Sequence, residues 1–210
     1  MKPETVGGYD MKKVLIASVT VAVLLLACGE EEGVTPADPP PEATTPVNVL
    51  KNVEISFNRV DIKILNDVLS PNFVFYFDPR DVGQNPPGSH YIIPESWDRA
   101  ELLKAVTKMF KKAFRISLSI ETGRVGEPRP EATAYQAENV PTELLVMLDE
   151  LNGALAEDSC TFEFERYLAE GGGKHWRLTT WRDRRDYSDQ EPATVEPATI
   201  GKILALFYTL

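Results

Sequence analysis

The sequence predicts an α+β domain in which N-terminal helices pack on a curved antiparallel or mixed sheet. Apolar residues first recur at the three- to four-residue spacing of a helix, in 46–60 and again in 98–114. Later they alternate with polar residues in three segments, which is typical of strands with one covered face. The chain is 43% hydrophobic and 26% charged, the composition of a globular protein. Residues 48–210 are long enough for one core, so we expect a single domain.

The N-terminal region has the pattern of a secretion signal. Residues 11–13, Met-Lys-Lys, carry positive charge, and an apolar run follows over 14–27. This run is too short to cross a hydrocarbon core of about 30 Å as a helix, but it suits a signal peptide. We interpret 1–10 as an upstream leader, because a complete signal peptide begins at Met11.

The end of the apolar run resembles the lipobox of bacterial lipoproteins. Residues 25–29 are Leu-Leu-Ala-Cys-Gly, with a small residue before the cysteine. The resemblance implies cleavage before Cys28 and attachment of lipid to it, and each buried lipid methylene adds about 0.8 kcal/mol of membrane affinity. Gly29 stands where an aspartate would imply retention in the inner membrane. We therefore expect a cell-envelope protein, anchored in the outer membrane and facing the periplasm.

The stretch that follows is acidic and rich in proline. Residues 28–47 contain three consecutive glutamates and five prolines but few large apolar groups, so we expect a lipidated cysteine and a disordered tether. The formal net charge of the chain is -10, and loss of residues 1–27 makes it more negative by one. Such a surface repels phosphate backbones, so we expect no nucleic-acid partner. With Cys28 lipidated, Cys160 has no disulfide partner, and we expect it to be a buried, inert thiol.

The domain is predicted to begin with helices. Thr45 and Pro46 suit the N-cap and first position of a helix that continues to residue 60. A short helix over 61–69 should stop at Ser70-Pro71, and aromatic density predicts a strand over 72–78.

A third helix follows a loop over 79–95. Asp98 can cap it, and Glu101 completes a capping box. Its expected buried stripe is Leu102, Leu103, Val106, Met109, Phe110 and Phe114. Its expected solvated face is Lys104, Lys108, Lys111 and Lys112.

Period-two alternation then predicts three strands. Their expected inward side chains are Ile116, Leu118, Ile120, Phe162, Phe164, Trp176 and Leu178. Residues 143–151 suit either a helix or a strand buried on both faces, and we favour the strand because the sheet needs a neighbour there. Residues 197–210 form a short amphipathic segment that we expect to dock as a helix.

Several of these segments resemble a known superfamily. The residues concerned are 57–61 (Phe-Asn-Arg-Val-Asp), 69–75 (Leu-Ser-Pro-Asn-Phe-Val-Phe) and 176–183 (Trp-Arg-Leu-Thr-Thr-Trp-Arg-Asp). With the element order, they resemble the cone-shaped nuclear-transport-factor-2-like fold, which includes SnoaL-like and ketosteroid-isomerase-like proteins. That fold carries isomerases, dehydratases, hydrolases and binding modules, so it implies a shape but no single function.

One position resembles a catalytic residue of that superfamily. Asp78 closes the aromatic strand where ketosteroid isomerases carry an aspartate base. Those enzymes stabilise the enolate with a tyrosine and a protonated aspartate, but the matching positions here are Val53 and Cys160 or Thr161. Each missing donor costs on the order of 3–4 kcal/mol. We therefore interpret Asp78 as the start of an Asp-Pro turn.

The remaining residues suggest binding without catalysis. His90 and His175 have no partners at metal-ligand spacing, so we expect neither metal nor cofactor. Our candidate pocket comprises Tyr76, Asp78, Trp97, Tyr135 and Trp181. The predicted function is an anchored envelope lipoprotein whose domain binds a small apolar ligand or a protein partner. The alternatives are an anchored isomerase or hydrolase that uses Asp78, and a structural envelope component.

The outer face of the sheet predicts a monomer. Its expected side chains are Ser117, Ser119, Glu121, Glu163, Glu165, Arg177 and Thr179. Stable homodimer interfaces have apolar centres depleted in charge, and a two-fold axis would bring these glutamates together.

Overall fold

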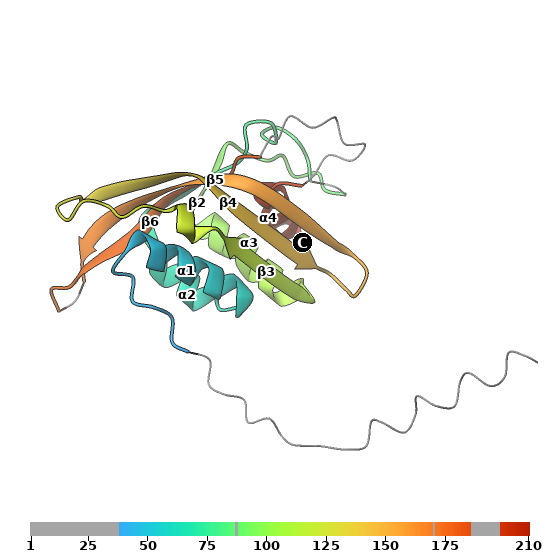
Figure 1. The fold of residues 1–210 in the computed structure, drawn as a ribbon. Helices are drawn as coiled ribbons and strands as arrows, with labels where there is room; N and C mark the ends of the chain where they lie inside the picture. Colours follow the sequence, from blue (N-terminus) through green and yellow to red (C-terminus); the bar gives the residue numbers. More distant parts are fainter. Residues whose placement is uncertain (1–37, 87, 170, 186–197) are drawn as a thin grey trace, which may run out of the picture. The chain divides into compact units, whose positions relative to one another are not determined.

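The computed structural model describes residues 38–210, except 87, 170 and 186–197 (Figure 1). The predicted signal peptide, Cys28 and the tether up to residue 37 lie outside the described residues. The later part of the predicted tether contacts the domain. The carbonyl of Pro41 accepts a hydrogen bond from Asn52 at 2.8 Å, and that of Ala43 accepts one from the backbone of Trp176 at 2.8 Å.

The first two helices begin at the predicted caps. Helix α1 spans Pro46–Asn58, and the Thr45 hydroxyl accepts a hydrogen bond from the backbone N–H of Asn48 at 3.1 Å. Helix α2 spans Ile62–Val68, and the Asp61 carboxylate accepts from the N–H of Lys63 at 2.8 Å. These caps satisfy N–H groups that have no partner within the helix.

The capping box of the third helix is confirmed. Helix α3 spans Arg99–Lys112, and Asp98 and Glu101 each accept a hydrogen bond from the other's backbone N–H, at 2.9 and 3.1 Å. The expected burial of Phe114 is wrong, because α3 ends two residues earlier and leaves that ring 66% exposed.

The part of the chain that the structure describes forms a sheet of six strands in the order β2-β1-β6-β5-β4-β3. Its strands are β1 Leu69–Tyr76, β2 Ser96–Asp98, β3 Arg115–Ile120, β4 Ala134–Met147, β5 Gly153–Leu168 and β6 Lys174–Arg182. The pair β1–β6 is parallel and every other pair is antiparallel. A short 3-10 turn, η1 (Thr122–Arg124), follows β3. In the described residues, four helices on a curved mixed sheet confirm the predicted fold class (Figure 1).

The ambiguous segment 143–151 contains the end of strand β4, as we favoured. The strand ends at Met147, a turn follows, and β5 begins at Gly153. Leu144 and Val146 are buried, whereas Glu143 is exposed and Leu145, between the two buried residues, is only partly buried. The expectation of burial on both faces is therefore wrong, because the helices cover only one face of this strand.

Apolar side chains fill the space between the sheet and the helices. The predicted inward residues of β3, β5 and β6 are all buried. Aromatic rings dominate the centre, where Trp181 lies 5.6 Å from Phe75 and 5.4 Å from Phe162, between ring centroids. Trp97 lies 4.7 Å from Phe77 in an edge-to-face contact. We call this space, enclosed by the concave face of the sheet, the interior; in the described structure it is a packed core.

The C-terminal segment forms the expected helix. Helix α4 spans Ile200–Thr209 and packs against α3 and β5. Its Tyr208 ring lies 4.9 Å from that of Trp97. Lys104 and Lys108, expected on a solvated face, contact this helix. Lys104 Nζ lies 4.0 Å from the Tyr208 ring centre, and Lys108 Nζ donates to the Tyr208 carbonyl at 2.8 Å.

Candidate functional site

Four buried aspartates gather beneath the N-terminus of α4. They are Asp78, Asp81, Asp158 and Asp183, none more than 3% exposed. Buried carboxylates are costly unless they are paired or hydrogen-bonded, so each requires partners. We call this group the aspartate cluster.

Three of these aspartates hold the first turn of α4. Asp158 Oδ2 accepts from the N–H of Ile200 at 2.7 Å, and Asp183 Oδ2 accepts from that of Gly201 at 2.6 Å. Asp81 accepts from the N-cap hydroxyl of Thr199 at 2.5 Å. Carboxylates satisfy the otherwise unpaired N–H groups of a helix N-terminus and favour its positive dipole end.

Two cations compensate Asp81. Lys202 Nζ and Arg185 Nη2 lie 2.9 and 3.1 Å from its Oδ1. The Asp158 and Asp183 carboxyls interact with each other, and the Oδ1 atom of each is buried without another hydrogen-bond partner among the described residues. Burial raises the pKa of Asp158 to about 6, and burial, followed by the charge of Asp158, raises the pKa of Asp183 well above its usual value. Because two neighbouring carboxylates resist ionising together, this pair retains a proton where isolated aspartates have lost theirs.

Both carboxylate oxygens of Asp78 accept hydrogen bonds from backbone N–H groups. Its Oδ1 accepts from the N–H of Arg80 at 2.8 Å, and its Oδ2 accepts from that of Arg185 at 2.9 Å. Its carbonyl accepts from the N–H of Asp81 at 2.9 Å, as expected for a turn. The resemblance places Val53 at one donor position of the isomerases and Cys160 or Thr161 at the other. Val53 and Cys160 are fully buried, and burial raises the pKa of the Cys160 thiol.

Sequence reasoning missed three members of the cluster, although a signal existed. Residues two apart on a strand point to the same face of the sheet. Asp158 therefore shares the inward face with Cys160 and Phe162, and Asp183 shares it with Trp181. An acid at an inward strand position predicts either a partner or a raised pKa. Titrating pairs of this kind occur in active sites, but here α4 covers the pair.

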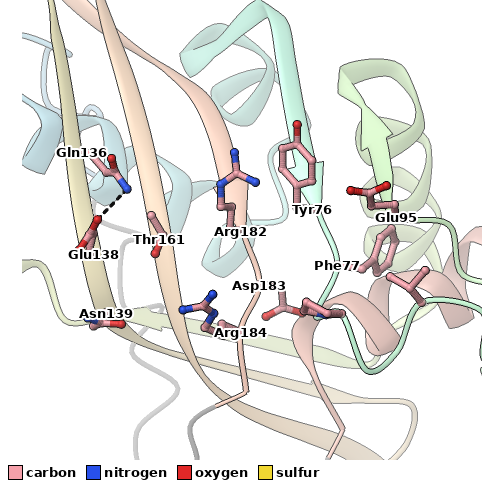
Figure 2. A pocket seen from close by; sticks show the side chains of 12 residues that line it. Tyr76, Phe77, Glu95, Gln136, Glu138, Asn139, Thr161, Arg182, Asp183 and Arg184 are labelled. Atoms are coloured by element: carbon pink, nitrogen blue, oxygen red, sulfur yellow. Dashed lines mark hydrogen bonds between the residues drawn. The ribbon is translucent and has the colours of Figure 1, made fainter.

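A second candidate site lies on the outer face of the sheet, and Asp183 of the aspartate cluster is among its lining residues. It is a half-open pocket of about 550 Å³, which we call the outer pocket. Its floor includes Tyr76 of β1, Arg182 of β6 and Thr161 of β5, from neighbouring strands (Figure 2). Glu138 and Asn139 of β4 line one side, and Glu95, from the loop between β1 and β2, lies on the other (Figure 2).

Charges in the outer pocket are mixed. The Arg182 guanidinium lies 4.0 Å from the centre of the Tyr76 ring, and its Nε lies 3.3 Å from Glu163 Oε1. Arg184, two residues further along on the same face, is exposed. Its side chain makes no hydrogen bond or ion pair with the described residues. Within the described part of the chain, the outer pocket therefore offers one guanidinium with a carboxylate partner, that of Arg182, and one without, that of Arg184.

The structure distributes the five predicted pocket residues over several places. Tyr76 lines the outer pocket and Asp78 belongs to the aspartate cluster. Trp97 and Trp181 are fully buried in the interior. Tyr135 is half-buried on β4, with its ring centre 6.1 Å from that of Phe164. These residues do not share one cavity.

The described residues contain no group of three or more His, Cys, Asp or Glu side chains arranged to hold a metal ion. His175 instead lies 3.1 Å from Glu42. In the same part of the chain, no helix has the length and hydrophobicity needed to cross a bilayer.

Comparison with known proteins gives likenesses of fold. No protein-family model and no curated protein matches the sequence. A nuclear transport factor 2-like superfamily protein of Salmonella enterica is 12% identical, with a TM-score of 0.45 over 68% of this chain and 89% of that one. A Rhodospirillum rubrum NTF2-like protein of unknown function in nutrient uptake is 12% identical, with a TM-score of 0.43 over 66% and 96%. A Caulobacter vibrioides protein with a cystatin-like fold is 14% identical, with a TM-score of 0.44 over 67% and 87%. Likenesses of this degree assign neither a family nor an activity.

Proposed function

We propose that this chain is a lipid-anchored protein of the bacterial cell envelope whose domain binds other molecules at its outer face without catalysing a reaction. The observation that carries the proposal is the packed interior. In a curved sheet covered by helices, a catalytic or ligand pocket needs open space on the concave side, and here aromatic rings occupy it.

Helix α4 adds a second reason. Ile200, Ile203, Leu204 and Phe207 are buried, and the aspartate cluster holds the helix N-terminus. A ligand entering beneath α4 would have to displace these side chains and break several hydrogen bonds of buried carboxylates. Binding on the outer face requires no such rearrangement.

The contacts of Asp78 argue against the enzymatic alternative. A general base needs an accessible oxygen within hydrogen-bond reach of the proton that it removes. Both oxygens of Asp78 accept backbone hydrogen bonds, and the side chain is nearly fully buried. A structural role in joining the end of β1 to the end of β6 accounts for these contacts.

The anchor in this proposal rests on the sequence of residues 11–28. The basic start, the apolar run and the small residue before Cys28 together suit a lipoprotein precursor. An acidic, proline-rich tether would hold the domain clear of the bilayer. Lipidation at Cys28 would place the domain on the periplasmic side of the outer membrane.

Metabolic labelling tests the anchor. In a bacterium that processes lipoproteins, the protein should incorporate radiolabelled palmitate, and Cys28→Ser should abolish the label. Cys160→Ser is the matched control and should keep it, because Cys160 is fully buried in the domain. Label that persists in Cys28→Ser would refute lipid attachment at this residue.

A further inference from the structure

A bulge in β4 helps to form the outer pocket. The pairing of β4 with β5 shifts register between Ala137 and Val140, and Asn139 adopts a φ of 53°. Non-glycine residues seldom adopt positive φ, although asparagine tolerates it better than most. Bulges interrupt regular pairing and recur beside functional sites. This one brings Glu138 and Asn139 to the side of the pocket, beside Thr161 of β5.

The pocket also has an apolar side. Pro79 and Val82, from the loop after β1, line it together with the Tyr76 ring. The Arg182 guanidinium lies over that ring, 4.0 Å from its centre, so the tyrosine and the arginine form adjoining parts of the floor. A volume of about 550 Å³ is sufficient for a small organic molecule with an apolar body.

The charges that line the outer pocket favour a ligand with a single negative charge. Glu163 compensates Arg182, whereas the side chain of Arg184 makes no ion pair with the described residues. A guanidinium binds a carboxylate through two parallel hydrogen bonds. Glu95 and Glu138 also line the pocket, so a dianion such as a phosphate monoester would bring surplus negative charge close to them.

We infer that the outer pocket binds a small monocarboxylate, with its carboxylate on Arg184 and its apolar body over Tyr76 and Val82. Thr161 lies beside the two arginines on the pocket floor and can donate its hydroxyl to the same carboxylate (Figure 2). The inference rests on the proposed binding function and adds the ligand class and the residue that selects it.

Ligand-observed fluorine NMR on the full-length chain in a nonionic detergent tests the inference. The probes are fluorobenzoate, its neutral isostere fluorobenzamide, and fluorophenyl phosphate. Fluorobenzoate should bind with a Kd of about 1 mM, as expected for so few atoms, and roughly tenfold more tightly than either other probe. Arg184→Gln should remove the preference for fluorobenzoate over fluorobenzamide.

Arg115→Gln is the matched control. Arg115 is an exposed arginine on β3 that does not line the outer pocket, and its loss should leave the preference intact. All variants share the same detergent background, so partition into micelles cancels from the comparison. Thr161→Val should weaken fluorobenzoate several-fold and gives a second test of the site.

Three results would overturn the inference: no fluorobenzoate binding, an undiminished preference in Arg184→Gln, or tighter binding of fluorophenyl phosphate than of fluorobenzoate. The palmitate experiment is independent of this site. Retained palmitate labelling combined with failed carboxylate binding would reject the ligand assignment and leave the proposed anchor in place.

Discussion

Replacing Gly201 by alanine should loosen α4 from the aspartate cluster. Gly201 is the second residue of the helix, and its N–H donates to Asp183 at 2.6 Å. An added Cβ would lie 2.6 Å from Phe77 Cδ1 and 2.9 Å from Asp183 Oδ2. Both distances are shorter than normal contacts, and both neighbours are buried, so the helix has to shift.

The expected loss of stability follows from two contributions. Overpacking a buried contact costs about 1–3 kcal/mol. Breaking the hydrogen bond to the Asp183 carboxyl adds roughly 1–3 kcal/mol, because its oxygen is left buried without a donor. The better helix propensity of alanine offsets at most about 1 kcal/mol of this loss of stability. We expect the free energy of unfolding to fall by about 2–4 kcal/mol.

Urea unfolding followed by tryptophan fluorescence measures this change, since Trp97, Trp176 and Trp181 are all buried. Gly123→Ala is the control: its added Cβ would meet no atom within 4 Å, so a change within about 0.5 kcal/mol is expected. Hydrogen exchange should show reduced protection of the α4 amides in Gly201→Ala only. A stability equal to that of the control, with α4 still protected, would refute the role assigned to this contact.

Three further predictions concern the aspartates and the outer face. Asp78→Asn should lower the free energy of unfolding by about 1–3 kcal/mol, because one backbone N–H loses its acceptor, and should change ligand binding only a few-fold. A hundredfold loss of a catalytic turnover in a folded variant would instead support the enzymatic alternative. Because the pKa of Asp158 is raised to about 6, the folded state binds more protons than the unfolded state above pH 4, and this group's contribution to stability is lost as pH rises through about 6. Relative to Asp158→Asn, the wild type should therefore become less stable between pH 4 and 6 in urea titrations, and the opposite slope would contradict the shift. The fragment from residue 34 should be monomeric at micromolar concentration, because a two-fold axis through the outer face would bring glutamates such as Glu121, Glu163 and Glu165 close to their copies in the second chain. A dimer mass in sedimentation equilibrium would reject this.

Local signals were sufficient for the helices and most strands. Thr45 and the pair Asp98 and Glu101 cap helices at the expected positions, because a cap depends only on residues within one turn. Alternation placed the inward residues of β3, β5 and β6, because successive side chains of a strand point to opposite faces. Half of β4 escaped prediction, because its first residues are mostly polar or lie at a bulge.

The sequence by itself determined the fold class, the caps, the inward residues of three strands and the expectation of a lipid anchor at Cys28. Only the tertiary structure decided that α4 docks over Asp158 and Asp183. These aspartates precede the helix residues whose N–H groups they accept, Ile200 and Gly201, by 42 and 18 positions in the chain. It also decided that the interior is packed with aromatic rings and that Arg182 and Arg184 line a pocket on the other face. The physical reason is that caps and alternation act between neighbours in the chain, whereas burial, charge compensation and a pocket depend on segments that only folding brings together.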